Sequence, residues 1–263
     1  MKILIKLGGT LLDAPESRGR LAGEIAAARS GSQIAVVHGG GKQMTRYLAE
    51  RGVESRFVNG LRVTTAEVLD AVLKVLAGAV NQELVAAFIA QGAQAVGLSG
   101  MDALVTEARQ LNPDLGFVGT PVQSNGRLLN LLVDSGFLPV IACLAGDRVG
   151  QFFNVNADQM AVSVAGAFGA DKLLFLTDVD GVRGANNVVY STLNPEECRG
   201  LIQSGVATGG MQAKLESALK ALESAIAEVV IAPGATPGIV GKLLNGERIG
   251  TRVLSASGEL RHA

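Results

Sequence analysis

Lys6 stands at the end of a short apolar run, and only Leu7 separates it from a glycine pair, Gly8 and Gly9. The run, residues 3–5, is rich in β-forming residues and too short for a helix, so it predicts a buried strand. A lysine ammonium beside glycine amides is a combination that binds phosphate oxygens. The alternative is a strand-end lysine that reaches solvent beside an ordinary turn. The stretch matches neither G-x-x-x-x-G-K-[ST] nor G-x-G-x-x-G, the common nucleotide-binding motifs.

A second glycine turn, His38-Gly39-Gly40-Gly41, follows the apolar run 33–37 and opens into a helical pattern. The end of a strand and the start of a helix together present free N–H groups and a positive helix dipole, which favour an anion. A flexible loop is the alternative, but ordering three glycines is entropically costly, and this favours a ligand-binding role. Another glycine turn, residues 208–210, leads into a helix that carries Lys214.

Two polar residues lie where local structure does not require them. Arg62 precedes the predicted start of a helix, which is the wrong end of the dipole for a cation. We therefore expect it to bind a carboxylate through its forked guanidinium, with a solvated loop arginine as the alternative. Asn154 follows two phenylalanines at an apolar strand end, where its amide needs a partner. Asp158, in contrast, suits the first turn of the next helix.

The residue types that are missing narrow the reaction class. The chain has two histidines, His38 in a glycine turn and His262 near the end, and no serine or cysteine in a nucleophile motif. Covalent or histidine-based hydrolysis is therefore poorly supported. Phosphoryl transfer fits better, because its loose transition state needs positioning and positive charge. A carboxylate acceptor is already ionised at neutral pH and requires no general base.

Composition argues against several other classes of protein. The 263 residues can bury a full core, and we see no uninterrupted apolar run long enough to span a membrane. The N-terminus lacks the features of a signal peptide, which predicts a cytoplasmic protein. The net charge of −1 and the absence of Trp argue against nucleic-acid binding. Cys143 and Cys198 stand far apart in apolar contexts, which indicates two reduced core thiols.

Apolar strands alternate with helical patterns along the chain. This alternation predicts an α/β fold in which a mainly parallel sheet is sandwiched between helices in three layers. We divide it into two lobes on one continuous sheet, an N-terminal lobe of residues 1–146 and a C-terminal lobe of residues 147–263. The expected strands are 3–5, 33–37, 95–98, 139–144, 172–176, 228–231 and 250–253.

Two local patterns refine this prediction. Thr64 and Glu67 fit a capping box, which predicts a long helix from Thr64 to about residue 92. Residues 103–122 alternate in short pieces, which indicates an antiparallel excursion from the main sheet. Pro113-Asp114 marks the turn between its two strands.

With these residues in view, the chain resembles the amino acid kinase family over nearly its whole length. Each shared motif is weak alone, but together and in the family's order they are specific. The motifs are Lys6-Leu7-Gly8-Gly9, His38-Gly39-Gly40-Gly41, Asn59-Gly60-Leu61-Arg62-Val63-Thr64, Asn154-Val155-Asn156-Ala157-Asp158-Gln159, Thr177-Asp178-Val179-Asp180-Gly181-Val182, and Gly210-Met211 with Lys214. The resemblance implies an acyl-amino-acid site in the N-terminal lobe, an ATP site in the C-terminal lobe, and phosphoryl transfer at the carboxyl edge of the sheet.

The resemblance also implies roles for the residues of the reaction centre. Lys6 and Lys214 would stabilise the transferred phosphoryl group, and Asp158 would hold both lysines in place. Gly8 and Gly9 would bind phosphate.

Further residues would bind the two substrates. Gly40 and Gly41 would cradle the acceptor carboxylate, Arg62 would pair with the substrate α-carboxylate, and Asn154 would bind its acetamido group. The nucleotide would be bordered by residues of a loop and of a turn: Thr177, Asp178, Asp180, Gly181, Val182 and Arg183, and Val206, Ala207, Thr208, Gly209 and Gly210.

The implied activity is ATP-dependent phosphorylation of the side-chain carboxylate of N-acetyl-L-glutamate to an acyl phosphate plus ADP, a step of arginine biosynthesis. Mg²⁺ would be carried by the ATP phosphates, because no cluster of carboxylates suggests a metal site made by the protein. Two alternatives stay open. One is a related kinase that acts on carrier-protein-bound aminoadipate or glutamate, and the other is a nucleotide-sensing homologue without turnover.

The resemblance finally bears on assembly. Members inhibited by arginine carry an extra N-terminal helix that links dimers into hexamers, and only Met1 and Lys2 precede the first strand here. We therefore expect a homodimer that arginine does not inhibit. The N-terminal lobes would form the contact, in part through an apolar stripe on the long helix, for which an ordinary core face is the alternative. The stripe consists of Val68, Val72, Leu76 and Val80.

Overall fold

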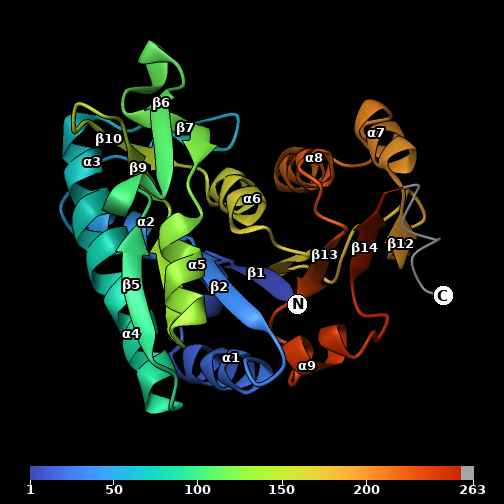
Figure 1. Cartoon of the computed structure of the whole chain (residues 1–263). Helices are drawn as coiled ribbons and strands as arrows, with labels where there is room; N and C mark the ends of the chain where they lie inside the picture. Colours follow the sequence, from blue (N-terminus) through green and yellow to red (C-terminus); the bar gives the residue numbers. More distant parts are fainter. Residues whose placement is uncertain (256–263) are drawn as a thin grey trace.

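The computed structural model describes residues 1–255, so His262 lies outside the described residues. Its centre is an eight-stranded sheet in which every neighbouring pair is parallel except β13 and β14. This confirms the predicted mainly parallel α/β fold (Figure 1). The strand order is β12 (Thr192–Leu193), β14 (Thr251–Leu254), β13 (Glu228–Pro233), β11 (Lys172–Thr177), β1 (Lys2–Leu7), β2 (Gln33–His38), β8 (Leu138–Ala142) and β5 (Ala95–Ser99).

The two halves of the sequence supply the two halves of this sheet and meet at β1 and β11. Strands buried on both faces read as continuous apolar runs, and five of the six residues of β1 are buried. Leu7 lies opposite Leu176 and also opposite His38, so β1 ends level with both of its neighbours. Side chains and turns at the carboxyl ends of these strands therefore meet at one edge of the sheet.

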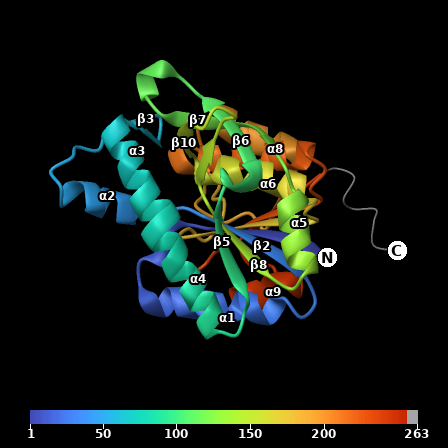
Figure 2. The same cartoon turned by 60° about the vertical axis from the view of Figure 1, so that its left-hand side comes forward.

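Helices cover both faces of the sheet, as Figures 1 and 2 show. α1, α4 and α9 pack together on one face, and α5, α6 and α8 lie on the other, with α7 against α8. The helices are α1 (Pro15–Ala28), α2 (Gly41–Ala49), α3 (Ala66–Val72), α4 (Asn81–Ala90), α5 (Arg127–Asp134), α6 (Ala157–Phe168), α7 (Pro195–Gln203), α8 (Gly209–Glu223) and α9 (Ile239–Leu244), with short 3₁₀ turns at η1 (Gly9–Leu12), η3 (Asp102–Leu104) and η4 (Pro113–Leu115).

A small four-stranded barrel stands beside the main sheet. Its strands are β10 (Phe152–Val155), β7 (Val118–Ser124), β6 (Thr106–Gln110) and β9 (Leu144–Gly146). β6 and β7 are antiparallel and joined through η4, which confirms the predicted excursion and its turn. β9 pairs with β10 across residue 146, so one hairpin spans the lobe boundary that we placed there.

The predicted capping box at Thr64 is wrong by one residue. Thr65 is the N-cap of α3, and its hydroxyl accepts a hydrogen bond from the Val68 N–H at 3.3 Å. Thr64 is instead held in extended conformation, because its N–H donates to the Leu115 carbonyl and its carbonyl accepts from Phe117. Its side chain is thereby turned inward and is fully buried.

The long helix runs from α3 through a π-helical segment, η2 (Leu73–Val80), into α4. The apolar stripe on this helix is buried in the core of the same chain, which supports the core-face alternative. By length and composition Ala66–Ala90 could cross a membrane, but 44% of its most apolar window is buried against the rest of the chain. Such a helix is more simply explained as a core helix.

Side chains cap two further helices. Asn156 caps α6, and Asn194 with Glu197 forms a complete capping box on α7. Both cysteines are free thiols and buried, as the sequence indicates. Burial raises the pKa of each thiol to about 11, so neither is ionised at neutral pH.

Candidate active site

Lys6, Asp158 and Lys214 meet at the carboxyl edge of the central sheet. Lys6 Nζ lies 2.7 Å from Asp158 Oδ1, and Lys214 Nζ lies 3.4 Å from Asp158 Oδ2. The three residues come from β1, α6 and α8, so the site joins both halves of the chain. The structure therefore brings together the three residues that the sequence analysis placed at the reaction centre.

The electrostatics of this triad favour an anionic ligand. Burial raises the pKa of the Asp158 carboxyl, but the two ammonium groups outweigh that effect and hold the pKa below its usual value. Asp158 is therefore ionised, and one carboxylate faces two lysines. The remaining positive charge lies on side chains that are largely buried, where charge interactions are stronger than in water.

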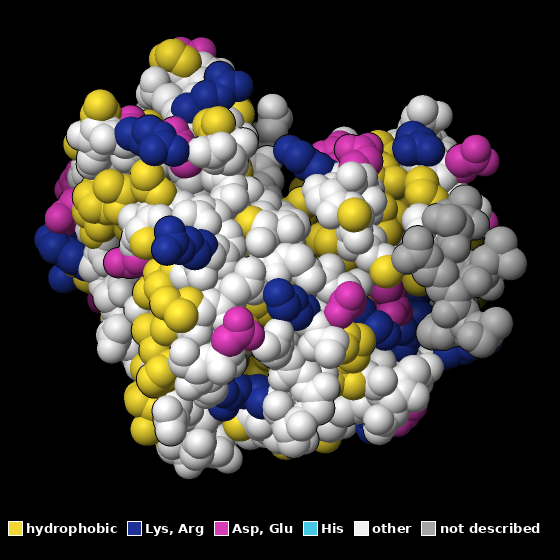
Figure 3. Space-filling view, in the orientation of Figure 1, with side chains coloured by type: hydrophobic (Ala, Val, Ile, Leu, Met, Phe, Trp, Pro, Cys, Tyr) yellow, Lys and Arg dark blue, Asp and Glu magenta, His cyan; other side chains and the backbone are white. Residues whose placement is uncertain are grey.

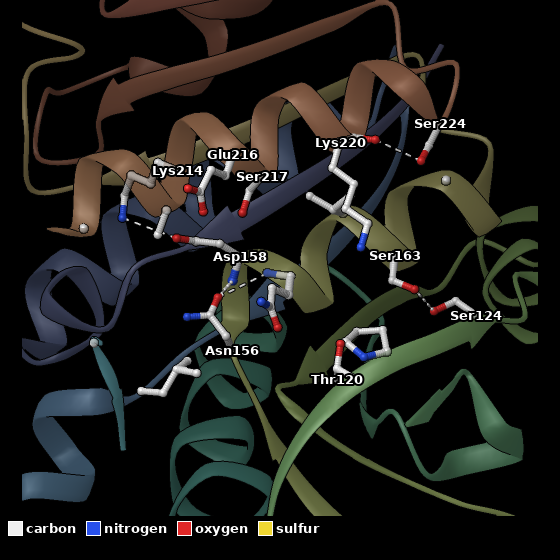
Figure 4. A pocket seen from close by; sticks show the side chains of 18 of the residues that line it. Thr120, Ser124, Asn156, Asp158, Ser163, Lys214, Glu216, Ser217, Lys220 and Ser224 are labelled. Atoms are coloured by element: carbon white, nitrogen blue, oxygen red, sulfur yellow. Dashed lines mark hydrogen bonds and ion pairs between the residues drawn. The ribbon is translucent and has the colours of Figure 1, made fainter. Parts of the chain in front are cut away.

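Local structure fixes each member of the triad. Lys6 is only 7% exposed at the end of a buried strand. Asn156 Oδ1 accepts from the Asp158 N–H at 2.9 Å and so fixes the start of α6. Lys214 lies near the start of α8 and points toward Asp158, as Figure 4 shows. Each side chain is thus carried by a regular element rather than by a loop.

A cavity of about 900 Å³ opens beside this triad. It lies between the β7 arm and α8, above α6, and Figure 3 shows the corresponding hollow in the surface. Asp158 and Lys214 are at one end, and the bonded hydroxyls of Ser124 and Ser163, 2.8 Å apart, are farther along it (Figure 4). The cavity is large enough for a nucleotide-sized ligand.

The triple glycine begins α2 at the same edge of the sheet. Gly40 is the N-cap residue of α2 and Gly41 its first residue. A Cβ on Gly40 would lie 2.3 Å from Leu76 Cδ2, so a larger residue would require the Leu76 side chain to move. The predicted arrangement of a strand end, a glycine turn and a helix start is confirmed.

The first glycine pair differs from the second. The Gly8 N–H donates to the Leu176 carbonyl at 2.9 Å, which extends the ladder between β1 and β11. Gly9 begins the 3₁₀ turn η1. Because the Gly8 amide already has a partner, a phosphate-binding role for this pair has to use another group of the turn.

Arg62 is 8% exposed and has no acidic partner among residues 1–255. Its guanidinium donates to the Gly41 carbonyl at 3.1 Å, to Thr45 Oγ1 at 2.8 Å and to Ser55 Oγ. It also stacks 4.5 Å from the centre of the Phe57 ring. Burial lowers its pKa from the usual value. A buried guanidinium held only by neutral groups is suited to an anionic ligand.

Asn154 and Thr64 extend the hydrogen-bonded network around Arg62. Asn154 Nδ2 donates to Thr64 Oγ1 at 3.1 Å, and the Thr64 hydroxyl donates to the Arg62 carbonyl at 2.9 Å. Sequence reasoning singled out Arg62 and Asn154 but missed Thr64, Thr45 and Ser55. Of these three, only Thr45 carried a sequence signal, since it lies one helical turn after Gly41.

A second cavity, of about 170 Å³, is lined by Arg62, Asn154 and all three glycines of the turn. Gly60, Leu61 and Asn156 border both this cavity and the larger one. A small ligand held by Arg62 and Asn154 would therefore be adjacent to the space beside the triad. The two residues that sequence reasoning could not explain locally belong to one site.

The predicted nucleotide loop follows β11. The Thr177 hydroxyl donates to Asp178 Oδ1 at 3.1 Å, and Arg183 forms an exposed ion pair with Asp180 at 2.6 Å. The Val182 N–H donates to Thr251 Oγ1 at 2.8 Å, which fixes the loop against β14. Gly181 lies close to the same strand, since a Cβ on it would be 2.8 Å from Thr251 Oγ1, and its φ is 148°.

The predicted nucleotide turn precedes α8. Val206 is 37% exposed, whereas Ala207 is buried with its N–H donating to the Leu201 carbonyl at 2.9 Å. Thr208 is the N-cap position of α8, followed by Gly209 and Gly210. Of the predicted nucleotide residues, these two glycines line the larger cavity.

The match to known proteins covers most of the chain. Residues 1–233 match the model of the amino acid kinase family. An acetylglutamate kinase of Solibacter usitatus is 59% identical over 257 residues, which are 97% of this chain and 100% of the relative.

Solved structures agree on the fold. N-acetylglutamate synthase from Neisseria gonorrhoeae, in complex with coenzyme A and N-acetyl-glutamate, has a TM-score of 0.86 and 26% identity, covering 96% of this chain and 59% of that chain. This chain thus spans less than two thirds of the synthase. The protein smu.665 from Streptococcus mutans has a TM-score of 0.83 and 28% identity, covering 96% and 98% of the two chains. With the family model and the Solibacter relative, these findings show that the chain belongs to the amino acid kinase family.

Proposed function

We propose that this protein transfers the γ-phosphoryl group of ATP to the side-chain carboxylate of N-acetyl-L-glutamate, forming an acyl phosphate and ADP in arginine biosynthesis. The relatives named acetylglutamate kinase support this proposal, since one shares 59% identity over nearly the full length of both chains. They favour it over a kinase for carrier-bound substrates and over a homologue without turnover.

The observation that carries the proposal is the small cavity beside the lysine pair. The buried guanidinium of Arg62 lines it and has no acidic partner among residues 1–255. Arg62 would bind the α-carboxylate of the substrate, which supplies the missing counter-charge. Asn154, which already donates to Thr64, would bind the acetamido group. Gly40 and Gly41 would cradle the reacting carboxylate at the start of α2.

The chain's own residues then act on the transfer step. A carboxylate oxygen of the substrate forms a bond to the γ-phosphorus while the bond from that phosphorus to the β–γ bridging oxygen breaks, and the electron pair leaves with ADP. Negative charge shifts toward the leaving oxygen, and the ammonium groups of Lys6 and Lys214 stabilise it. Asp158 holds both ammonium groups in position through its ion pairs.

The nucleotide would extend from the triad into the C-terminal lobe. The loop 177–183 and the turn 206–210 would border it, and the turn of Gly8 and Gly9 would lie against its phosphates. Mg²⁺ would be bound mainly by the ATP phosphates and would neutralise part of their charge. Among residues 1–255 no group of three metal-ligating side chains offers it a separate site.

Substrate choice tests the proposal directly. Coupled ADP release should be measured with N-acetyl-L-glutamate, glutamate and aminoadipate at equal concentrations. We expect turnover with the acetylated substrate to exceed that with free glutamate strongly. Free glutamate lacks the acetamido group and would leave the amide of Asn154 without its proposed ligand contact. Equal turnover of all three acceptors, or none with any of them, would refute the proposal.

We also propose a homodimer formed through the N-terminal lobe. β5 ends the central sheet, residues 95–98 on it are half-buried, and Ile89 of the adjoining α4 is 57% exposed. Figure 3 shows an apolar band on this side of the molecule. A free strand edge beside exposed apolar side chains is a surface that a second copy can cover. Light scattering should give a dimer mass, reduced by Ile89→Glu, whereas a monomeric wild type would contradict this.

We place the protein in the cytoplasm. Two free buried thiols are typical of a reducing compartment, and the biosynthetic reaction proposed here uses ATP. Fractionation of cells that express the full chain should recover it with soluble enzymes. Recovery with membranes would count against this location.

A further inference from the structure

His38 lies directly behind the glycine turn and takes no part in the reaction described above. It is the last residue of β2 and is fully buried. Its Nδ1 lies 2.9 Å from the Gly39 carbonyl oxygen, and its Nε2 lies 3.0 Å from Asn81 Nδ2. Asn81 Nδ2 in turn lies 2.9 Å from the Val140 carbonyl oxygen of β8. The imidazole thus links the glycine turn to α4 and to the neighbouring strand.

The chemistry of these contacts fixes the protonation of the imidazole. A carbonyl oxygen only accepts, so Nδ1 carries the proton that is donated to Gly39. The amide nitrogen of Asn81 only donates, and its two protons go to its two nearer acceptors, the Val140 carbonyl and Nε2, while the Leu98 carbonyl lies farther away at 3.5 Å. Nε2 must therefore be unprotonated, and the imidazole is neutral. Burial lowers the pKa of His38 to about 4, in agreement with a neutral ring.

The bond to the Gly39 carbonyl fixes the next amide. A peptide unit is planar and trans, so its N–H points away from its C=O. Because His38 holds the Gly39 carbonyl on the core side, the Gly40 N–H is directed away from the imidazole. Gly39 and Gly40 both line the small cavity, so the imidazole sets the orientation of a peptide in its wall.

His38, Asn81 and Leu76 form a clamp on the glycine turn, which His38 and Leu76 contact directly and Asn81 contacts through His38. The π-helical segment orients the last two of these side chains, Asn81 and Leu76. Leu76 lies within the segment and packs on Gly40, while Asn81 directly follows it and holds His38. Residues five apart in a regular α-helix differ by about 140° around the axis and face different ways. The i→i+5 bonds of a π-helix bring such residues onto one face. The irregular turn therefore directs both side chains to the same glycine turn.

A neighbouring glycine makes room for the amide of Asn81. A Cβ on Gly97 of β5 would lie only 2.2 Å from Asn81 Oδ1. The backbone of β5 at Gly97 therefore packs directly against the Asn81 amide, on a side that does not face the cavity. This gives a way to disturb Asn81 without altering any group in the cavity wall.

We propose that His38 and Asn81 are positioning residues for phosphoryl transfer: together they hold the Gly39–Gly40 peptide so that its amide faces the reacting groups. This proposal rests on the proposed function, because it assigns the glycine turn to the reacting carboxylate. It predicts an effect on the rate of transfer rather than on the affinity for either substrate. Neither residue lines the small or the large cavity, so both would act through the glycine turn.

Kinetics of three variants test the clamp. His38→Leu removes the donor to Gly39 and should lower kcat by about 10- to 100-fold with both KM values nearly unchanged, since a small misplacement near the reacting atoms is costly. His38→Asn retains an N–H near the position of Nδ1 and should remain within about threefold of the wild type. Gly97→Ala should lower kcat less than His38→Leu does, because it displaces chiefly Asn81, with Gln82 and Val85 in looser contact at 3.1 and 3.2 Å, and leaves the donor to Gly39 in place.

A matched control separates positioning from stability. Ile239→Val lies in α9, which packs on α1 and away from the glycine turn, is fully buried, and should cost about 1 kcal/mol of stability without changing kcat. Wild-type kcat in His38→Leu, or a loss of kcat in Ile239→Val that matches its loss of stability, would overturn the proposal.

Nitrogen-15 NMR of the histidine ring gives a readout that needs no turnover. The full-length wild type should show a protonated Nδ1 and an unprotonated Nε2 at pH 7, and Gly97→Ala should shift both signals. A ring protonated at Nε2 would refute the network even if the enzyme is active. Conversely, an inactive wild type with the expected ring signals would refute the proposed function and leave the observed network in place.

Discussion

The two regions that we propose to bind the acyl substrate and the nucleotide hold their polar side chains in different ways. In the N-terminal region, Arg62 and Asn154 are bonded to neighbouring hydroxyls inside a cavity of about 170 Å³. In the C-terminal loop, Asp180 and Arg183 pair with each other, with 63% and 46% of their side chains exposed. The first region is thus organised before a ligand arrives, whereas the second can rearrange at little cost.

This difference predicts a division of labour. A preorganised polar cavity discriminates strongly, because any ligand that leaves its groups unpaired is rejected. An exposed loop tolerates change, because water replaces a lost contact. Substitutions in the two regions should therefore affect different kinetic constants and by different amounts.

The largest effect should come from the lysine pair, which belongs to neither region. Lys6→Ala and Lys214→Ala should each lower kcat by on the order of 3 kcal/mol, more than 100-fold, with smaller changes in both KM values. Their charges matter most when negative charge shifts to the leaving oxygen. Steady-state kinetics with both substrates varied would show this split.

Lys172→Ala is the matched control. Lys172 pairs with Glu228 at 2.6 Å at the start of β11, away from the carboxyl edge of the sheet. It should keep its kcat. Near-normal kcat in Lys6→Ala or Lys214→Ala would remove that lysine from the reaction centre.

Acid should destabilise the fold through buried His38, which lies behind the glycine turn of the N-terminal region. The pKa of His38 falls from 6.5 in the unfolded chain to about 4 in the folded one, so the unfolded state binds the proton more readily. The contribution of His38 to the free energy of unfolding is present in full above pH 6.5 and declines as pH falls toward 4. The loss is about 2 kcal/mol at pH 5. Urea unfolding at pH 7 and pH 5 measures this loss, and His38→Asn should reduce it. The same decline in His38→Asn would assign it to other groups.

Asp158 contributes in a lower pH window. Its pKa is held below the usual value, so its contribution is present at neutral pH and is lost only as the carboxyl becomes protonated in stronger acid. Unfolding between pH 7 and pH 5 therefore reports mainly on His38. This separation makes the pH experiment specific to the clamp behind the glycine turn.

Arg62→Lys should break the specificity of the organised cavity. A lysine keeps the charge but loses the planar fork that bonds Gly41, Thr45 and Ser55. We expect the KM for N-acetyl-L-glutamate to rise by about tenfold and the KM for ATP to stay nearly constant, since one bidentate contact is lost. Arg20→Lys alters another forked arginine, bonded to Gly234 and Thr236, and should change neither KM. A selective rise in the KM for ATP in Arg62→Lys would move Arg62 to the nucleotide.

Asn154→Ala should have a smaller effect of the same kind. Removing the amide leaves Thr64 without its donor and takes away the proposed contact to the acetamido group. The preference for acetylated over free glutamate should fall by roughly three- to tenfold, about the free energy of one hydrogen bond. Competition between the two acceptors measures this ratio directly. An unchanged ratio would exclude Asn154 from acyl recognition.

The fold was predictable because its signals are local. Continuous apolar runs such as that of β1 mark strands buried on both faces, and the glycine turns mark strand ends that meet at one edge. Arg62 and Asn154 were informative because each contradicted its local context. Their joint placement in one cavity needed the fold, since 92 positions separate them in the sequence.

The failures of prediction have tertiary causes. Thr64 and Thr65 can both cap a helix, and the choice was made by the backbone bonds of Thr64 to Leu115 and Phe117. The π-helical turn escaped detection because the stripe at four-residue spacing fits an α-helix equally well. The barrel depends on pairing between short strands far apart in the chain, for which local patterns carry little signal.

The smallest effect should come from the exposed loop. Arg183→Ala removes the ion pair to Asp180 and the bonds to Asn187, all near the surface. Exposed pairs of this kind contribute about 0.2–1 kcal/mol, and the loop stays fixed through the Val182 bond to Thr251. We therefore expect a rise in the KM for ATP of about twofold or less and no change in the KM for the acyl substrate, since water can replace the lost contacts. A rise above tenfold in the KM for ATP would show that this loop is as organised as the acyl cavity, and the contrast between the two regions would then fail.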